Sequence, residues 1–80
     1  MLLYPNPSSD QRLRVEFLPK HEGEIFAVSL YDLRGVLLYE TSISGKLANL
    51  SFDNQRISSG MYFLKFKSNT ANYVVKWMKM

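Results

Sequence analysis

The sequence contains no cysteine, and His21 is its only histidine. Disulfides, a cysteine nucleophile and a zinc site are therefore excluded, because zinc needs several clustered histidine or cysteine ligands. The four glycines stand apart from one another, so a glycine-rich phosphate loop is absent as well. His21 lies in the charged run Lys20-His21-Glu22, which predicts a solvated loop residue rather than a general base. These absences predict that the chain is not an enzyme and needs no cofactor.

Long apolar runs and helical periodicity are also missing. The uncharged apolar stretches are far shorter than the roughly 18 residues of a membrane-spanning helix, so no membrane span is predicted. Residues 1–4 run directly into Pro5, which is unlike the apolar core of a signal peptide. Any export signal would then belong to a larger precursor. We expect Met1 to be an added start and residues 1–80 to be a single C-terminal domain excised from that precursor.

Acidic residues are absent from the C-terminal third of the chain. Residues 1–53 carry seven acidic and five basic side chains, a net charge of −2, whereas residues 54–80 carry five basic side chains and no acid, a net charge of +5. A basic end favours an anionic partner. It is equally explained by lysines that protect an exposed edge strand from aggregation.

Alternation of apolar and polar residues with a period of two runs through the chain and is typical of β-strands. Leu13, Val15 and Phe17, for example, alternate with charged residues. Comparable segments follow at residues 24–33, 36–43, 47–52, 61–67 and 73–78. The pattern predicts an all-β fold, an Ig-like β-sandwich of about seven antiparallel strands.

Turn residues separate these segments. The run from Asp32 to Gly35 predicts a type I turn closed by a glycine in the left-handed region. Residues 19–23 and 68–70 have the length and polarity of hairpin loops. Ile57 lies in a longer crossing, and we expect it to enter the core as the chain changes sheet.

Aromatic side chains and oxygen ligands are the remaining candidates for binding. Tyr31, Tyr39 and Phe63 are predicted to point away from the apolar face, where aromatics beside lysines could stack on sugars or single-stranded nucleic acid. The loop oxygen ligands lack the spacing of a calcium loop, and turn chemistry explains most of them, so no metal is predicted. These ligands are Asn6, Asp10, Asp32, Asp53 and Asn54.

Four motifs in a fixed order resemble one family. They are the YPNP motif within residues 3–8, the hairpin at 28–36, the strand start at 57–65 and the basic, apolar ending at 75–80. Together they resemble the C-terminal sorting domains of type IX (Por) secretion, type A. The candidate sorting and recognition residues that the resemblance marks are Tyr4, Pro5, Asn6, Pro7, Asp32, Gly35, Gly60, Tyr62, Lys76, Trp77 and Lys79.

The resemblance implies a function in protein export. Such domains are Ig-like sandwiches at the C-terminus of cargo proteins in Bacteroidetes-type bacteria. It implies transit through the periplasm, recognition by the outer-membrane translocon, removal by a sortase-like protease, and a cargo that ends at the cell surface or is secreted. The implied partners are the translocon, the protease and a covalently joined N-terminal cargo.

The residues suggest how the motifs could act. Pro5 and Pro7 restrict the backbone and would stiffen the junction between cargo and domain. Gly60 and Tyr62 are expected to serve the fold. The lysines 76 and 79 flank Trp77 near the free C-terminus, where a receptor could capture the strand by adding it to a sheet. An exposed edge strand could also support a strand-mediated dimer.

Two other classes of function remain open at this stage. The first is an accessory carbohydrate- or protein-binding module of a secreted hydrolase or adhesin, which would need a cluster of exposed aromatics on one face. The second is a nucleic-acid binder that uses the basic half, which salt-sensitive binding would reveal. The sorting signal is the function that the motifs favour, with no nucleic acid as partner.

Overall fold

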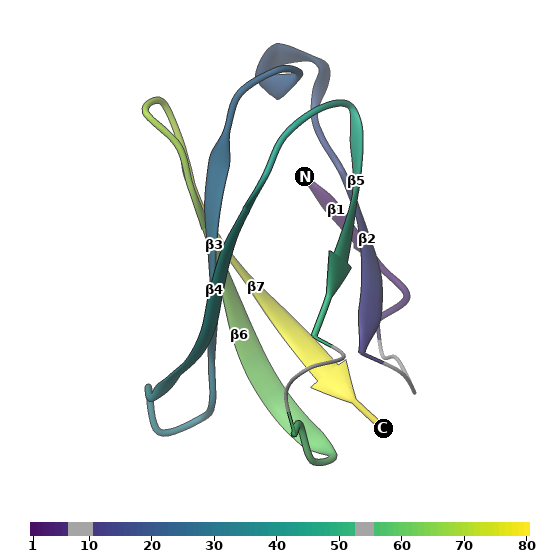
Figure 1. The fold of residues 1–80 in the computed structure, drawn as a ribbon, viewed down its shortest axis with the longest axis vertical. Coiled ribbons are helices and arrows are strands. Elements are labelled where there is room, and N and C mark those ends of the chain that lie inside the picture. Colours follow the sequence, from purple (N-terminus) through teal and green to yellow (C-terminus); the bar gives the residue numbers. More distant parts are fainter. Residues whose placement is uncertain (7–10, 53–55) are drawn as a thin grey trace.

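The computed structural model describes residues 1–6, 11–52 and 56–80, and within them seven β-strands form two antiparallel sheets. The smaller sheet has the order β1-β2-β5, with β1 at Leu2–Tyr4, β2 at Arg12–Glu16 and β5 at Leu47–Ser51. The larger sheet has the order β4-β3-β6-β7, with β4 at Leu37–Ile43, β3 at Phe26–Tyr31, β6 at Gly60–Lys67 and β7 at Asn72–Lys79. Figure 1 shows the sheets as two facing layers. The predicted Ig-like sandwich is confirmed.

The core lies between the sheets because alternate residues of each strand face inward. In the larger sheet Leu30 is opposite Leu64, and Val28 is opposite Phe66. These four side chains are at most 1% exposed. The smaller sheet contributes inward residues of the same kind, which include Leu13, Val15 and Leu50.

Three connections carry the chain from one sheet to the other: β2 to β3, β4 to β5 and β5 to β6. Ile57 lies between β5 and β6 and is buried in the core, as predicted. The loop at 19–23 was predicted to be a hairpin, and this was wrong: it joins β2 to β3, which belong to different sheets. The loop contains a short 3₁₀ turn, η1 (Pro19–His21), whose last residue is buried. Burial of Phe17 and His21 holds the crossing against the end of the sandwich.

The β3–β4 hairpin closes with the predicted turn. The Gly35 N–H donates to the Asp32 carbonyl at 3.0 Å, and Gly35 has a φ of 83°, which favours glycine. The Asp32 carboxylate accepts hydrogen bonds from the backbone N–H groups of Arg34 and Val36. The side-chain hydrogen bond from Arg34 and the backbone one from Val36 lower the pKa of Asp32. Asp32 and Gly35 therefore build this turn.

A register shift in the same hairpin overturns one expectation about aromatic side chains. The β3–β4 register shifts between Leu30 and Tyr31, which leaves Tyr39 opposite Leu30. Tyr39 therefore faces the core, where its ring packs edge-on against Phe52 with centroids 5.5 Å apart. The prediction that Tyr39 points outward was wrong. Tyr31 and Phe63 pair with each other on the outer face, as expected.

Candidate functional site

Gly60 and Tyr62 form a tyrosine corner at the start of β6. The Tyr62 hydroxyl donates to the Ser58 carbonyl at 2.6 Å, four residues upstream, while its ring is buried. Ig-like sandwiches use such a contact to fix the chain as it enters a strand. Gly60 has a φ of 151°, which residues with a side chain rarely adopt. These two motif residues have a structural role in the folded domain.

Trp77 lies in the core rather than on the surface. Its side chain is 0% exposed and packs against Phe52 and Tyr62, with ring centroids 5.4 and 5.6 Å away. Its Nε1 has no hydrogen-bond partner within the described part of the chain. A receptor cannot contact this side chain while the domain is folded. Of the candidate sorting and recognition residues, Trp77 is therefore one that the fold buries.

Asn6 of the YPNP motif is bound to the C-terminal strand, although the two lie about 70 positions apart in the sequence. Its Nδ2 donates to the Lys76 carbonyl at 2.7 Å, and its Oδ1 accepts from the Met78 N–H at 3.1 Å. We call this pair of hydrogen bonds the Asn6 latch. β7 is an edge strand of the larger sheet, and β1 is an edge strand of the smaller one. The Asn6 latch therefore joins the two sheets at their edges.

The Asn6 latch also occupies part of the free edge of β7. A side-chain amide that pairs with a carbonyl and with the N–H two residues later satisfies the groups that a neighbouring strand would otherwise use. An added strand could bond the edge at Lys76 and Met78 only after Asn6 had left. Capture of the whole strand by sheet addition, as predicted from the sequence, therefore competes with this contact.

We expect Asn6→Ala to lower the free energy of unfolding by about 1 kcal/mol, since two hydrogen bonds at an exposed site are lost. Urea denaturation followed by circular dichroism measures the change. Asn49→Ala is the matched control, because Asn49 is exposed on the other sheet, and its effect should stay within about 0.5 kcal/mol. Equal losses in both variants would contradict the role given to the latch.

Lys76 and Lys79 lie on opposite sides of β7, although both flank Trp77 in the sequence. Lys76 is exposed on the outer face of the larger sheet and pairs with Phe63. Lys79 lies on the same side of the strand as Trp77, is half-buried, and its Nζ donates to the Met80 carbonyl at 3.3 Å. The structure therefore does not join the two lysines into one surface.

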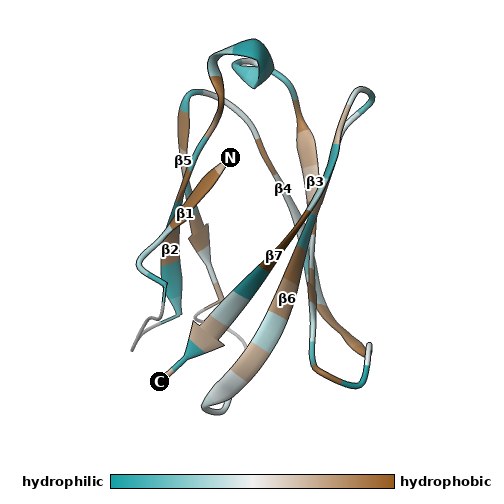
Figure 2. Ribbon diagram, turned by 180° about the vertical axis from the view of Figure 1, so that it is seen from behind, coloured by the Kyte–Doolittle hydropathy of each residue, from teal (hydrophilic) through white to brown (hydrophobic). Residues whose placement is uncertain are grey.

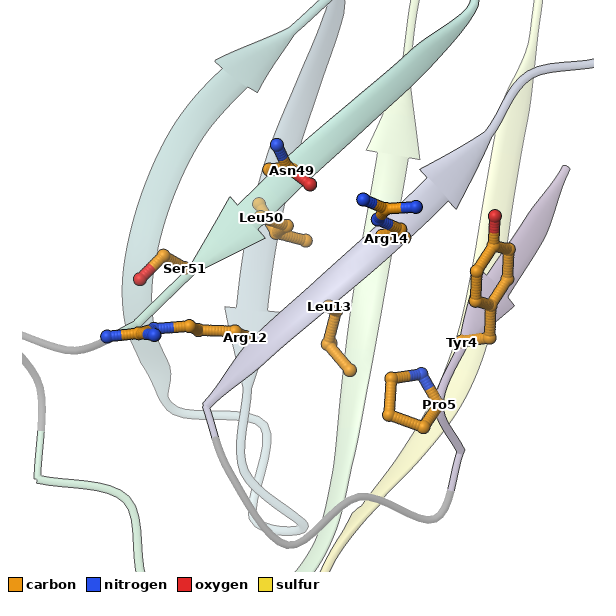
Figure 3. Close-up of a pocket in the computed structure, with 8 residues that line it drawn as sticks. All are labelled: Tyr4, Pro5, Arg12, Leu13, Arg14, Asn49, Leu50 and Ser51. Atoms are coloured by element: carbon orange, nitrogen blue, oxygen red, sulfur yellow. The ribbon is translucent and has the colours of Figure 1, made fainter.

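Tyr4 and Pro5 line a hollow of about 440 Å³ on the smaller sheet. The register pairs Tyr4 with Arg14 and Arg14 with Asn49, and Figure 3 shows the three side chains on the same side of the sheet. The prediction placed the prolines at the junction with a cargo. Pro5 follows β1 and therefore lies between β1 and β2 of the sandwich. Pro7 lies outside the described residues.

The two candidate oxygen ligands that the structure describes, Asn6 and Asp32, each have a different partner. Asn6 binds β7, and Asp32 binds its own turn. Asp10, Asp53 and Asn54 lie outside the described residues. Across residues 1–6, 11–52 and 56–80 no three His, Cys, Asp or Glu side chains lie close enough together to hold a metal ion. The same residues include no helix with the length and hydrophobicity needed to cross a membrane.

His21 was expected to be solvated, and this was wrong. It is 5% exposed, with Nδ1 2.6 Å from the Glu24 carboxylate and Nε2 2.7 Å from the Tyr73 hydroxyl. Ser68 and Thr70 donate to the other oxygen of Glu24 at 2.9 and 2.6 Å. The network joins the 19–24 loop to the β6–β7 turn. A lone histidine three residues before a glutamate was the only signal for it in the sequence.

This network predicts a pH effect on stability. Hydrogen bonds from Thr70, His21 and Ser68 lower the pKa of Glu24 from 4.5 to about 2. A depressed folded-state pKa stabilises the fold above the unfolded value, and the contribution is lost as the pH falls from 4.5 toward 2. Glu24→Gln should therefore reduce the fall in the urea midpoint across this range.

The control for this pH effect is Glu22→Gln, since Glu22 is an exposed acid in the same loop. Urea titrations at about pH 5 and about pH 2 measure both variants beside the wild-type chain. Glu22→Gln should keep the wild-type decline. The interpretation is wrong if Glu24→Gln declines as steeply as the wild-type chain.

A comparison with known proteins shows to which family the chain belongs. No curated protein sequence matches the chain significantly. The sequence model of the family described as "Secretion system C-terminal sorting domain" matches residues 2–80. The chain belongs to this family. Its function is that of a C-terminal sorting signal in secretion, and the family is not a catalytic one.

A solved structure supports the fold of this sorting domain. The chain is similar to part of PorZ, described as an essential bacterial surface component of the type-IX secretion system of human oral-microbiomic Porphyromonas gingivalis. The TM-score is 0.70 at 22% sequence identity, over 99% of this chain and 11% of the PorZ chain. The likeness therefore concerns one small part of PorZ.

Most motif residues of the sorting domain have a structural role, and fewer are exposed on a surface. Asp32, Gly35, Gly60 and Tyr62 build turns and strand starts, and Asn6 ties the first strand to the last. These contacts involve neighbouring backbone groups and buried side chains. Among the candidate recognition residues that the structure describes, Lys76 is the exposed cation on the outer face of the larger sheet.

Proposed function

We propose that the chain is the type A C-terminal sorting signal of a cargo protein exported by type IX secretion. In this proposal the cargo precedes Leu2, the precursor crosses the periplasm, and the outer-membrane translocon reads the folded sandwich. A sortase-like protease then separates the domain from a cargo that ends at the cell surface or in the medium. The observation that carries the proposal is the family match across residues 2–80.

In this proposal the translocon recognises β7, which lies at the edge of the larger sheet. β7 is an edge strand, and its outward residues are exposed. The groups of Lys76 and Met78 that point to the free edge are held by Asn6. A receptor that adds a strand would use the part of the edge nearer Asn72, or it would displace Asn6. The outward side chains of β7 are accessible without either change.

The Asn6 latch has a second consequence in this proposal. It holds the chain just after β1 against β7, so the N-terminal strand is anchored close to the end that the receptor reads. A receptor bound at β7 therefore also constrains the segment through which the cargo is attached.

A fusion experiment tests the proposed function. A reporter placed between a signal peptide and residues 1–80 should reach the surface of a host that has type IX secretion. Surface labelling of intact cells measures the exported fraction. The same reporter without residues 1–80 is the control and should stay in the periplasm. If the complete fusion stays there too while its domain is folded, the proposed function is wrong.

A further inference from the structure

The outward residues of β6 and β7 share one surface of the larger sheet. Their positions follow from the register, in which Phe63 is opposite Lys76 and Lys65 is opposite Val74. Inward residues alternate with them and form the core. We call this surface the outer β6–β7 face and define it by Phe63, Lys65, Lys67, Val74, Lys76 and Met78.

The outer β6–β7 face carries three lysines, and within the described residues none of them forms an ion pair with an acidic side chain. Lys65, Lys67 and Lys76 are exposed on it, and residues 54–80 include no acidic side chain. Among the cross-strand pairs of this sheet, the acidic residue nearest to Lys65 is Glu40 on β4. Ser29 of β3 lies between the two residues. An acidic partner would therefore meet an attractive field here.

The same face also exposes large apolar side chains between the lysines. Val74 is 65% exposed and Met78 is 41% exposed. Figure 2 shows apolar and polar segments following one another along β7. Lysines alone would protect an edge strand from aggregation, and that role does not require exposed valine and methionine beside them. Apolar groups interspersed with cations are the composition of a contact surface.

The Asn6 latch favours contact through side chains rather than through the strand edge. Asn6 already satisfies the Lys76 carbonyl and the Met78 N–H at that edge. The side chains of the same two residues are exposed on the outer face. A partner can therefore bind the face while the latch stays closed.

We propose that the outer β6–β7 face is the surface that the type IX receptor contacts, and that the receptor presents a protein surface of carboxylates with apolar side chains between them. This inference rests on the proposed function. Lys65, Lys67 and Lys76 supply long-range attraction, and Val74 and Met78 supply the desolvated contact. Recognition leaves the core and the latch unchanged.

Charge reversal on the export fusion tests the inference. We expect Lys65→Glu, Lys67→Glu and Lys76→Glu combined to lower the surface fraction of the reporter about tenfold. The matched control reverses the exposed cations Lys20, Lys46 and Arg56, which lie away from this face. The control has the same net charge and should be exported at the wild-type level. Trp77 fluorescence of the purified chains checks that both variants are folded.

The outcomes separate the two proposals. If the unmodified fusion is exported and the folded face variant is exported equally well, the face is not the contact surface, although the sorting function stands. If the control variant loses export as strongly, export depends on the net charge of the domain rather than on the position of the lysines, and the inference fails. Failure of the unmodified fusion would instead contradict the proposed function.

Two binding titrations test other anionic partners. The purified chain is mixed with poly(U) RNA and, separately, with vesicles that contain phosphatidylglycerol. We expect no saturable binding to either at physiological salt. Binding that the combined replacement of Lys65, Lys67 and Lys76 by glutamine abolishes would assign the face to a nucleic acid or a lipid surface, and would overturn a protein partner.

Discussion

Replacing Trp77 by alanine is expected to leave the chain without a cooperative unfolding transition. The side chain is fully buried and lies against the rings of Phe52 and Tyr62. Removing a buried tryptophan costs about 3–5 kcal/mol. A domain of 80 residues has only about 4–12 kcal/mol of stability in total. The loss is therefore a large fraction of the stability of the sandwich, and at the lower end of this range it equals the whole.

Far-UV circular dichroism in a urea titration measures this loss. Val74→Ala is the matched control, because Val74 lies on the same strand, faces outward and is 65% exposed. We expect the control to stay within about 0.5 kcal/mol of the wild-type chain. A cooperative Trp77→Ala transition with a midpoint near that of the control would show that the core does not depend on this ring.

Removing residues 76–80 from the export fusion is expected to hold the reporter in the periplasm. The truncation removes Trp77 from the core and both backbone partners of Asn6 from β7. It also removes the strand partners of Gly60 to Phe63 at the start of β6. Surface labelling of intact cells, with total reporter as the reference, measures the retained fraction.

Two variants separate folding from recognition in this experiment. Trp77→Phe keeps an aromatic ring in the core and leaves the outer face intact, so its fusion should still be exported. Removing Met80 alone, which is 64% exposed, should have little effect. The importance given to the C-terminal strand is wrong if the fusion that lacks residues 76–80 reaches the surface as the complete one does.

Most motif residues of the sorting domain stabilise the fold. They do not themselves form the surface that a receptor would contact. Tyr62 and Trp77 lie in the core, and Asp32 binds its own hairpin turn. Mutation of these residues would reduce export by unfolding the signal. Lys76 differs because its side chain is exposed. Asn6 binds the backbone carbonyl of Lys76, and none of the hydrogen bonds described above involves the Lys76 side chain. Loss of export at Lys76 with the fold intact would point to recognition directly.

Local patterns were sufficient to predict the strands other than β1, and several of their connections. A period of two shows which residues of a strand share a face, so the inward positions of β6 and β7 followed from the sequence. The turn at Asp32 and Gly35 and the β6–β7 turn depend on residues within four positions of each other. Such short-range chemistry can be interpreted without knowing the fold.

Local patterns failed where a contact depends on another strand. Tyr39 was assigned to the wrong face because a shift in pairing with β3 reverses the alternation of its strand. His21 was assigned to solvent because its partner Tyr73 lies 52 residues away. The loop at 19–23 has the length of a hairpin, but length does not reveal which sheet the next strand joins.

By itself the sequence determined that this is a β-sandwich with a basic, strand-forming C-terminus, and its motifs identified the sorting family. Only the tertiary structure decided which motif residues are buried, that Lys76 and Lys79 lie on opposite sides of β7, and that Asn6 closes part of the free edge. The physical reason is that alternation and turn chemistry act between near neighbours. Burial, register and edge contacts are set by segments that meet only when the two sheets pack together.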